Sequence, residues 1–203
     1  MQSSRNMAWR WVGAGGPMRN MNGFSMIELF IVMVLFGIMA AIAALGYAYV
    51  QRHQLIAASQ RLFGDLQGLR QNAMTQQAAG VVARGFGVRF EQGTGPNGED
   101  QYVLFQFNDV DNDFIYDGTG EELAPTTSMR IPSSVTVRDT SGAVLTAADV
   151  LIYDGFGIAR SGDWGIPSTG TMVLNRSGIT QARCIVVSLT RLKEGAWNGT
   201  QCT

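Results

Sequence analysis

The hydrophobic residues of this 203-residue chain are concentrated in one uninterrupted run near the N-terminus. Residues 29–50 form a stretch of 22 positions without a charged side chain. A helix of that length rises about 33 Å, which matches the hydrocarbon core of a bilayer. The pattern therefore predicts a transmembrane helix, which we place at residues 24–50.

The segment before this run, residues 1–23, holds three arginines and no acidic residue. Positive charge ahead of a first apolar segment keeps that end in the cytoplasm and exports the rest of the chain. A cleavable secretory signal is the alternative, and the alanines at 40–44 could supply its cleavage site. The run is longer than the core of such a signal, and Glu28 stands at its start. A carboxylate at the edge of a membrane helix requires a partner, so Glu28 is a candidate functional residue.

Residues 51–80 alternate between apolar and polar positions with the period of a helix. The apolar positions recur at steps of three and four, which places them on one face: Leu55, Ala58, Leu62, Leu66, Leu69 and Ala73. No proline occurs between Pro17 and Pro96, so nothing interrupts the backbone hydrogen bonds of a helix. We therefore expect one helix from Ser25 to Ala79, whose second half is amphipathic.

After Gly80 the hydrophobic period changes to two, which is typical of strands. Short runs rich in Val, Ile, Phe and Tyr are separated by turn residues. We expect strands at 81–90, 101–107, 134–138, 150–153, 171–174 and 184–189. The sequence therefore predicts an α+β protein, in which a long N-terminal helix packs on a mostly antiparallel sheet or sandwich formed by residues 81–203.

The residues at the start of the apolar run carry a family resemblance. The stretch Gly23-Phe24-Ser25-Met26-Ile27-Glu28-Leu29 resembles the processing signal of type IV pilins and pseudopilins, in which a basic leader ends in Gly before Phe and a Glu follows. The resemblance implies that a prepilin peptidase cleaves between Gly23 and Phe24 and methylates the new amine of Phe24. It also implies that Glu28 neutralises the terminal ammonium of a neighbouring subunit during assembly.

This leader is longer than those of the family. Residues 18–23 alone would form an ordinary short leader, so we expect translation to start at Met18. Removal of residues 1–23 leaves 12 basic and 16 acidic residues, which changes the formal charge of the chain from −1 to −4. The exported product is therefore expected to be acidic, which does not favour nucleic-acid binding over its whole surface.

One basic corner remains near the C-terminus. Residues 182–193 resemble the end of the GspH/FimT family, some of whose members bind DNA through a Gly-Arg-x-Arg tail. Here the equivalent is Thr190-Arg191-Leu192-Lys193, so a Thr and a Lys depart from the pattern. The candidate DNA-binding residues are Arg176, Arg183, Arg191 and Lys193. The alternative is a solvated strand edge whose charges discourage pairing with another strand.

Two further features concern the exported part. Its only cysteines, Cys184 and Cys202, are expected to form a disulfide in an oxidising periplasm, with free buried thiols as the alternative. The segment 109–117 has aspartates at alternating positions, which could offer oxygen ligands to Ca²⁺. It lacks the Gly and Glu of an EF-hand, so we favour a solvated acidic loop and predict no metal and no cofactor.

These features together predict a structural protein rather than an enzyme. The single histidine, His53, lies in the helix, and no arrangement of nucleophile, base and orienting group is apparent. The resemblance implies a minor pilin held in the inner membrane with a periplasmic head and later placed in a pilus. Its expected partners are the peptidase, other pilins, the inner-membrane assembly platform, membrane lipid and, as a candidate, DNA. A type II secretion pseudopilin and a DNA-binding pilin for natural transformation are the alternatives.

Overall fold

The computed structural model describes residues 25–78, 85–111, 113, 115–162 and 169–203. Its main helix, α1, is continuous from Met26 to Ala78. The predicted helix is confirmed to within one residue at each end, as the absence of proline suggested. By its contacts, the chain divides into two units, residues 1–44 and 45–203. The second unit contains residues 45–78 of α1 and the domain formed by residues 81–203, which we call the head.

The first part of α1 leaves its large apolar side chains exposed. Met26, Phe30 and Phe36 are 92%, 67% and 68% exposed, respectively. In the part of the chain that the structure describes, no helix combines the length and apolarity needed to cross a membrane. The transmembrane helix expected at residues 24–50 stays a prediction.

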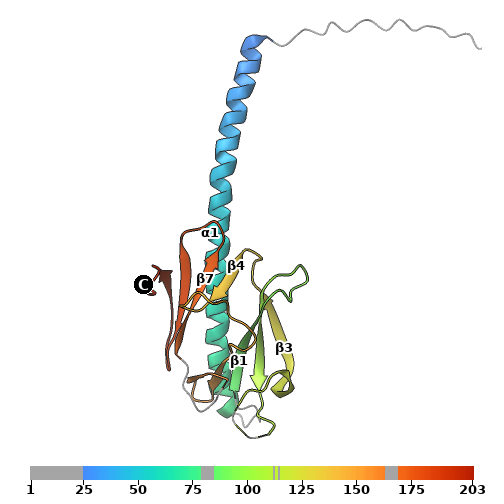
Figure 1. Cartoon of the computed structure of the whole chain (residues 1–203), viewed down its shortest axis with the longest axis vertical. Coiled ribbons are helices and arrows are strands. Elements are labelled where there is room, and N and C mark those ends of the chain that lie inside the picture. Colours follow the sequence, from blue (N-terminus) through green and yellow to red (C-terminus); the bar gives the residue numbers. More distant parts are fainter. Residues whose placement is uncertain (1–24, 79–84, 112, 114, 163–168) are drawn as a thin grey trace, which may run out of the picture. The chain divides into compact units, whose positions relative to one another are not determined.

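The head contains nine strands among the described residues, and every strand pair within its sheets is antiparallel (Figure 1). They are β1 (Gly85–Glu91), β2 (Gln101–Phe107), β3 (Glu122–Arg130), β4 (Val135–Arg138), β5 (Leu151–Asp154), β6 (Ala159–Arg160), β7 (Gly170–Arg176), β8 (Ala182–Val187) and β9 (Leu192–Trp197). One sheet has the order β3-β2-β1-β5-β6, and the other has the order β4-β7-β8-β9. A single turn of 3-10 helix, η1 (Thr119–Glu121), precedes β3. The predicted α+β class is confirmed.

The six expected strands are present as β1, β2, β4, β5, β7 and β8, with ends shifted by a few residues. The start of the first expected strand, residues 81–84, lies outside the described residues. Three strands, β3, β6 and β9, were not expected. β3 contains Pro125, β9 contains Gly195, and β6 has two residues. All three are the last strands at a sheet edge, where pairing on one side suffices and residues with weak strand preference are tolerated.

One hydrophobic core joins the second half of α1 to both sheets. On the helix, Leu55, Leu62 and Leu66 are at most 2% exposed. They share a cluster with Val88 of β1 and Leu174 of β7. The predicted apolar stripe is therefore confirmed, and burial of such side chains supplies most of the stability of a domain this size.

A second, smaller core covers the other face of the first sheet. Phe105 and Phe107 of β2 pack with Ile152 of β5, and Tyr116 lies against them. The ring centroids of Tyr116 and Phe105 are 5.1 Å apart. Tyr116 belongs to the acidic segment between β2 and β3, so this loop acts as a cover for the sheet.

Candidate functional site

The processing signal lies at the N-terminal end of α1. Gly23 and Phe24, the predicted cleavage and methylation positions, lie outside the described residues. Ser25 is the residue before α1, and its carbonyl oxygen accepts hydrogen bonds from the backbone N–H groups of Glu28 and Leu29 at 2.9 and 3.1 Å. The last residues of the processing signal therefore form the first turn of the helix.

Glu28 lies in this first turn and is exposed. A negative charge is favourable there because the free backbone N–H groups make a helix N-terminus positive. The spacing Ser25-x-x-Glu28 is also that of a capping box, a signal that our sequence reasoning missed. The exposed carboxylate is accessible to a cation from outside the chain. The role of Glu28 in assembly stays a prediction.

The two cysteines are joined by a disulfide in the structure. Their Cα atoms are 5.8 Å apart, and Cys184 is fully buried in β8. Cys202 lies in the last three residues, which pair with the outer edge of β9. The backbone groups of Ala196 and Thr203 exchange two hydrogen bonds of 2.9 Å. The disulfide therefore fixes the C-terminus against the edge of a sheet.

Two of the four candidate DNA-binding cations serve the fold. Arg176 is only 8% exposed, and its Nη1 donates to the carbonyl oxygen of Gln51 at 3.1 Å and to the side-chain oxygen of Gln54. Arg183 is paired with Glu194 across the β8–β9 ladder at 2.7 Å. These contacts tie β7 to α1 and β8 to β9.

The other two candidates are exposed: Arg191 directly precedes β9, and Lys193 is its second residue. The four cations therefore do not form one surface cluster. Two exposed charges can contact two phosphates at most, which gives weak and salt-sensitive binding. DNA binding by this chain stays a prediction.

The acidic loop uses several of its carboxylates for its own hydrogen bonds. Glu121 is buried and accepts from the backbone N–H groups of Val110 and Asp117 at 3.3 and 2.8 Å. Asp109, also buried, accepts from the N–H of Asp113 at 3.1 Å. The loop therefore has an internal structural role. We expected a solvated loop, but Asp109 and Glu121 are buried because backbone N–H groups of the loop itself bind their carboxylates.

Carboxylate oxygens in this loop also lie close enough together to share a cation. One group comprises Asp109, Asp111 and Glu121, and the other comprises Asp111, Asp113 and Asp117. Within each group the ligand atoms are within 4.8 Å of one another. The neighbouring Tyr116 donates its hydroxyl to Glu122 at 2.5 Å. Burial and this carboxylate raise the pKa of Tyr116 above its usual range, so the phenol stays protonated. The prediction that no metal is required stays a prediction.

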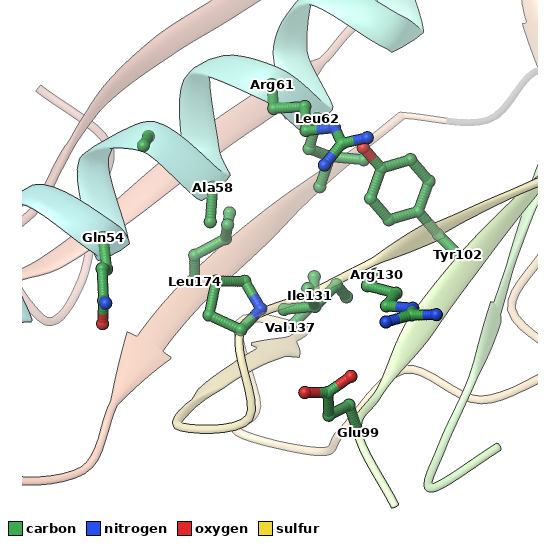
Figure 2. A pocket seen from close by; sticks show the side chains of 12 residues that line it. Gln54, Ala58, Arg61, Leu62, Glu99, Tyr102, Arg130, Ile131, Val137 and Leu174 are labelled. Atoms are coloured by element: carbon green, nitrogen blue, oxygen red, sulfur yellow. The ribbon is translucent and has the colours of Figure 1, made fainter. Parts of the chain in front are cut away.

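A cavity of about 320 Å³ lies between α1 and the two sheets (Figure 2). Its apolar part includes Leu62, Ile131 and Leu174, and its polar part includes Arg130 and Glu99. One carboxylate oxygen of Glu99 is buried and has no hydrogen-bond partner among the described residues. The lining therefore combines apolar side chains with a hydrogen-bond acceptor and a positive charge.

One wall of this cavity is held rigidly by Tyr102. Its hydroxyl donates to Asp65 of α1 at 2.5 Å, so β2 is tied to the helix beside the cavity. Burial and the Asp65 carboxylate raise the pKa of Tyr102 well above its ordinary value. The phenol of Tyr102 is therefore protonated at neutral pH and can donate this hydrogen bond.

Among known protein families, the chain matches the prokaryotic N-terminal methylation motif over residues 18–44. This range includes the predicted cleavage position, Phe24 and Glu28. This motif supports a type IV pilin-like protein. No curated protein and no solved structure matches the chain. That support rests on the N-terminal motif alone. Residues 45–203 have the helix-on-antiparallel-sheet architecture that the resemblance implied.

Proposed function

We propose that this pilin-like protein is a minor pilin of the type IV pilus. A prepilin peptidase removes residues 1–23 and methylates the amine of Phe24. The subunit is stored in the inner membrane by the apolar part of α1, with the head in the periplasm. It then primes filament assembly and sits at or near the tip, and its action is structural rather than enzymatic. The proposal includes that this minor pilin is of the GspH/FimT type.

The observation that carries the proposal is the methylation motif followed by an exposed apolar helix. The family match covers the leader and the start of α1. Directly after it, side chains such as Tyr47 and Tyr49 are 69% and 65% exposed, although they are large and partly apolar. Exposed apolar surface of this extent requires a partner, either lipid or other helices. A subunit that moves from a membrane into a filament has both.

The decisive test is mass analysis of the N-terminus of the mature protein. We expect a chain that begins at an N-methylated Phe24 in cells with the peptidase and an uncleaved chain in cells without it. A Glu28→Ala variant is the matched control, since it should be processed normally but fail to enter filaments. A mature terminus near residue 45 would show a secretory signal and overturn the proposal.

Two alternatives share this processing. A type II secretion pseudopilin would be cleaved and methylated in the same way, so the distinguishing result is loss of secretion rather than loss of pili on deletion. A DNA-binding pilin for transformation is favoured only by the exposed Arg191 and Lys193. An Arg191→Ala, Lys193→Ala double variant that retains normal DNA uptake would remove that alternative.

A further inference from the structure

A polar cavity of about 500 Å³ lies where the turn after β7 meets the segment before β4. Its lining is rich in hydroxyl groups and cations: Ser133, Ser134, Thr136, Ser177, Arg138 and Arg176. Among the described residues that line it, none is acidic. Hydroxyl donors combined with two guanidinium groups are the partners that an oxyanion requires.

Arg176 gives this cavity a built cationic wall. The residue is 8% exposed, and its Nη1 is held by α1 through the carbonyl oxygen of Gln51 and the side chain of Gln54. Its Nε is buried and has no hydrogen-bond partner among the described residues. Both acceptors of Nη1 are uncharged oxygens, so these bonds do not neutralise the positive charge of the guanidinium.

Arg138 forms the second cationic wall and is also held in place. Its Nε donates to Thr136 Oγ1 at 3.3 Å and its Nη1 to the carbonyl oxygen of Gly142 at 2.9 Å. Neither contact neutralises its charge, because both acceptors are uncharged groups. The cavity therefore presents two positive charges at fixed positions.

The position of the cavity in the fold suggests where the oxyanion comes from. Arg176 contacts Gln51, the residue that directly follows the uncharged run 29–50. Tyr49 and Val50 belong to the same compact unit as the cavity and are 65% and 52% exposed. Tyrosines are enriched at membrane–water interfaces, and the phosphates of lipid headgroups lie at that level.

We propose that this cavity binds the phosphate of a phospholipid headgroup and holds the head against the membrane surface while the subunit is stored. The inference rests on the proposed membrane anchor. It assigns Arg176 to lipid rather than to DNA, since the exposed Arg191 and Lys193 are not part of the lining. Entry into a filament would then require release of this lipid contact.

The test measures hydrogen exchange of the full chain in two environments that differ in phosphate. In nanodiscs of phosphatidylglycerol we expect the backbone amides of residues 133–138 and 175–179 to exchange about fivefold more slowly than in maltoside micelles. That factor corresponds to the attraction of about one basic side chain to an anionic membrane surface. Inorganic phosphate added to the micelles is the arm for a free anion. Equal protection by inorganic phosphate alone would overturn the assignment to lipid.

Variants separate binding from folding. Ser177 is exposed in the turn after β7, so Ser177→Asp adds a repelling charge beside the cavity and should abolish the protection. Ser128→Asp adds the same charge at an exposed position of β3, outside the lining, and should leave the protection intact. Arg176→Gln should also abolish it, but the buried position makes this variant useful only if the fold is retained.

The outcomes distinguish this inference from the proposed function. If the chain does not enter nanodiscs, the membrane anchor and this inference both fail. If it enters but residues 175–179 show the same exchange in both environments, or Ser177→Asp retains the protection, only this inference fails. Stronger protection by an oligonucleotide than by lipid would also overturn it and favour DNA as the ligand.

Discussion

The two halves of α1 are one helix by hydrogen bonding and differ entirely in what surrounds them. In the first half, Leu29 and Leu35 are 56% and 55% exposed, although leucine is strongly apolar. In the second half, Leu62 and Leu66 are at most 1% exposed because the two sheets cover them. Leucine therefore serves two purposes in one element. The apolar side chains of the first half need lipid or another helix to cover them. Those of the second half are covered by the two sheets of the same chain.

The largest test of this comparison exchanges one leucine in each half for alanine. Leu66→Ala leaves a cavity in the core, and we expect the free energy of unfolding of the head to fall by about 4 kcal/mol. Leu35→Ala is the matched control and should change that free energy by less than about 0.5 kcal/mol. Urea titration of the full chain in detergent, followed by near-ultraviolet circular dichroism, measures both. Equal effects would contradict the division between the halves.

A second test concerns the disulfide, which stabilises the head alone. Replacement of both Cys184 and Cys202 by serine removes a constraint on the unfolded chain, and we expect a loss of about 3 kcal/mol. The same urea titration measures the loss. Because the bond fixes the C-terminus on β9, proteolysis at the C-terminus should also become faster. Unchanged stability after reduction of the native protein would show that the β9 pairing suffices by itself.

A third test compares two glycines. A Cβ at Gly87 of β1 would lie 2.4 Å from the buried ring of Phe105, so Gly87→Ala should cost about 2 kcal/mol of stability. A Cβ at Gly64 of α1 would meet no atom within 4 Å. Gly64→Ala should therefore stabilise the helix by up to about 1 kcal/mol. A stability loss in both variants would indicate that Gly64 faces a contact that the structure does not contain.

The smallest expected effect concerns how the stability of the head depends on pH in the acidic range. Burial tends to raise the pKa of Glu91, but hydrogen bonds from Gln101, Arg89 and Thr94 outweigh it and lower the pKa below its ordinary value. A carboxylate whose pKa is lower in the folded state contributes stability above its unfolded pKa and loses it as the pH falls through the folded pKa.

The pair of Glu91 with Arg89 is partly buried, with side chains 19% and 12% exposed. Solvent still screens the pair, so we expect a contribution of about 1 kcal/mol or less. Glu91→Gln should remove that part of the acid dependence, measured as the midpoint of urea unfolding between neutral and acidic pH. An identical acid profile in the variant would show that another carboxylate is responsible. High salt should reduce the difference, because it screens surface charges.

Some parts of this protein were predictable because their signals are local. The stripe from Leu55 to Ala73 repeats every three to four residues, and no proline interrupts it, so the helix and its buried face follow directly from the sequence. The six expected strands alternate or cluster in β-branched and aromatic residues. The methylation motif is contiguous, and its residues need no folded context to be identified.

Other parts could not be predicted because they depend on neighbours far along the chain. β3 and β9 have compositions that disfavour strands, and they form because β2 and β8 offer unpaired edges. Arg176 and Arg183 look like exposed cations in the sequence. In the structure, however, Arg176 donates to Gln51, 125 residues away, and Arg183 pairs with Glu194 across the β8–β9 ladder, so both are held by partners within the fold.

The sequence by itself determined the helix, its two kinds of surface, the main strands and the processing signal, because each depends on residues that are close together in the sequence. Only the tertiary structure decided which charges are exposed. It paired two of the four C-terminal cations inside the head and placed Arg176 in a polar cavity beside the end of the apolar run. The physical reason is that burial of a charge depends on the partners that the fold brings to it.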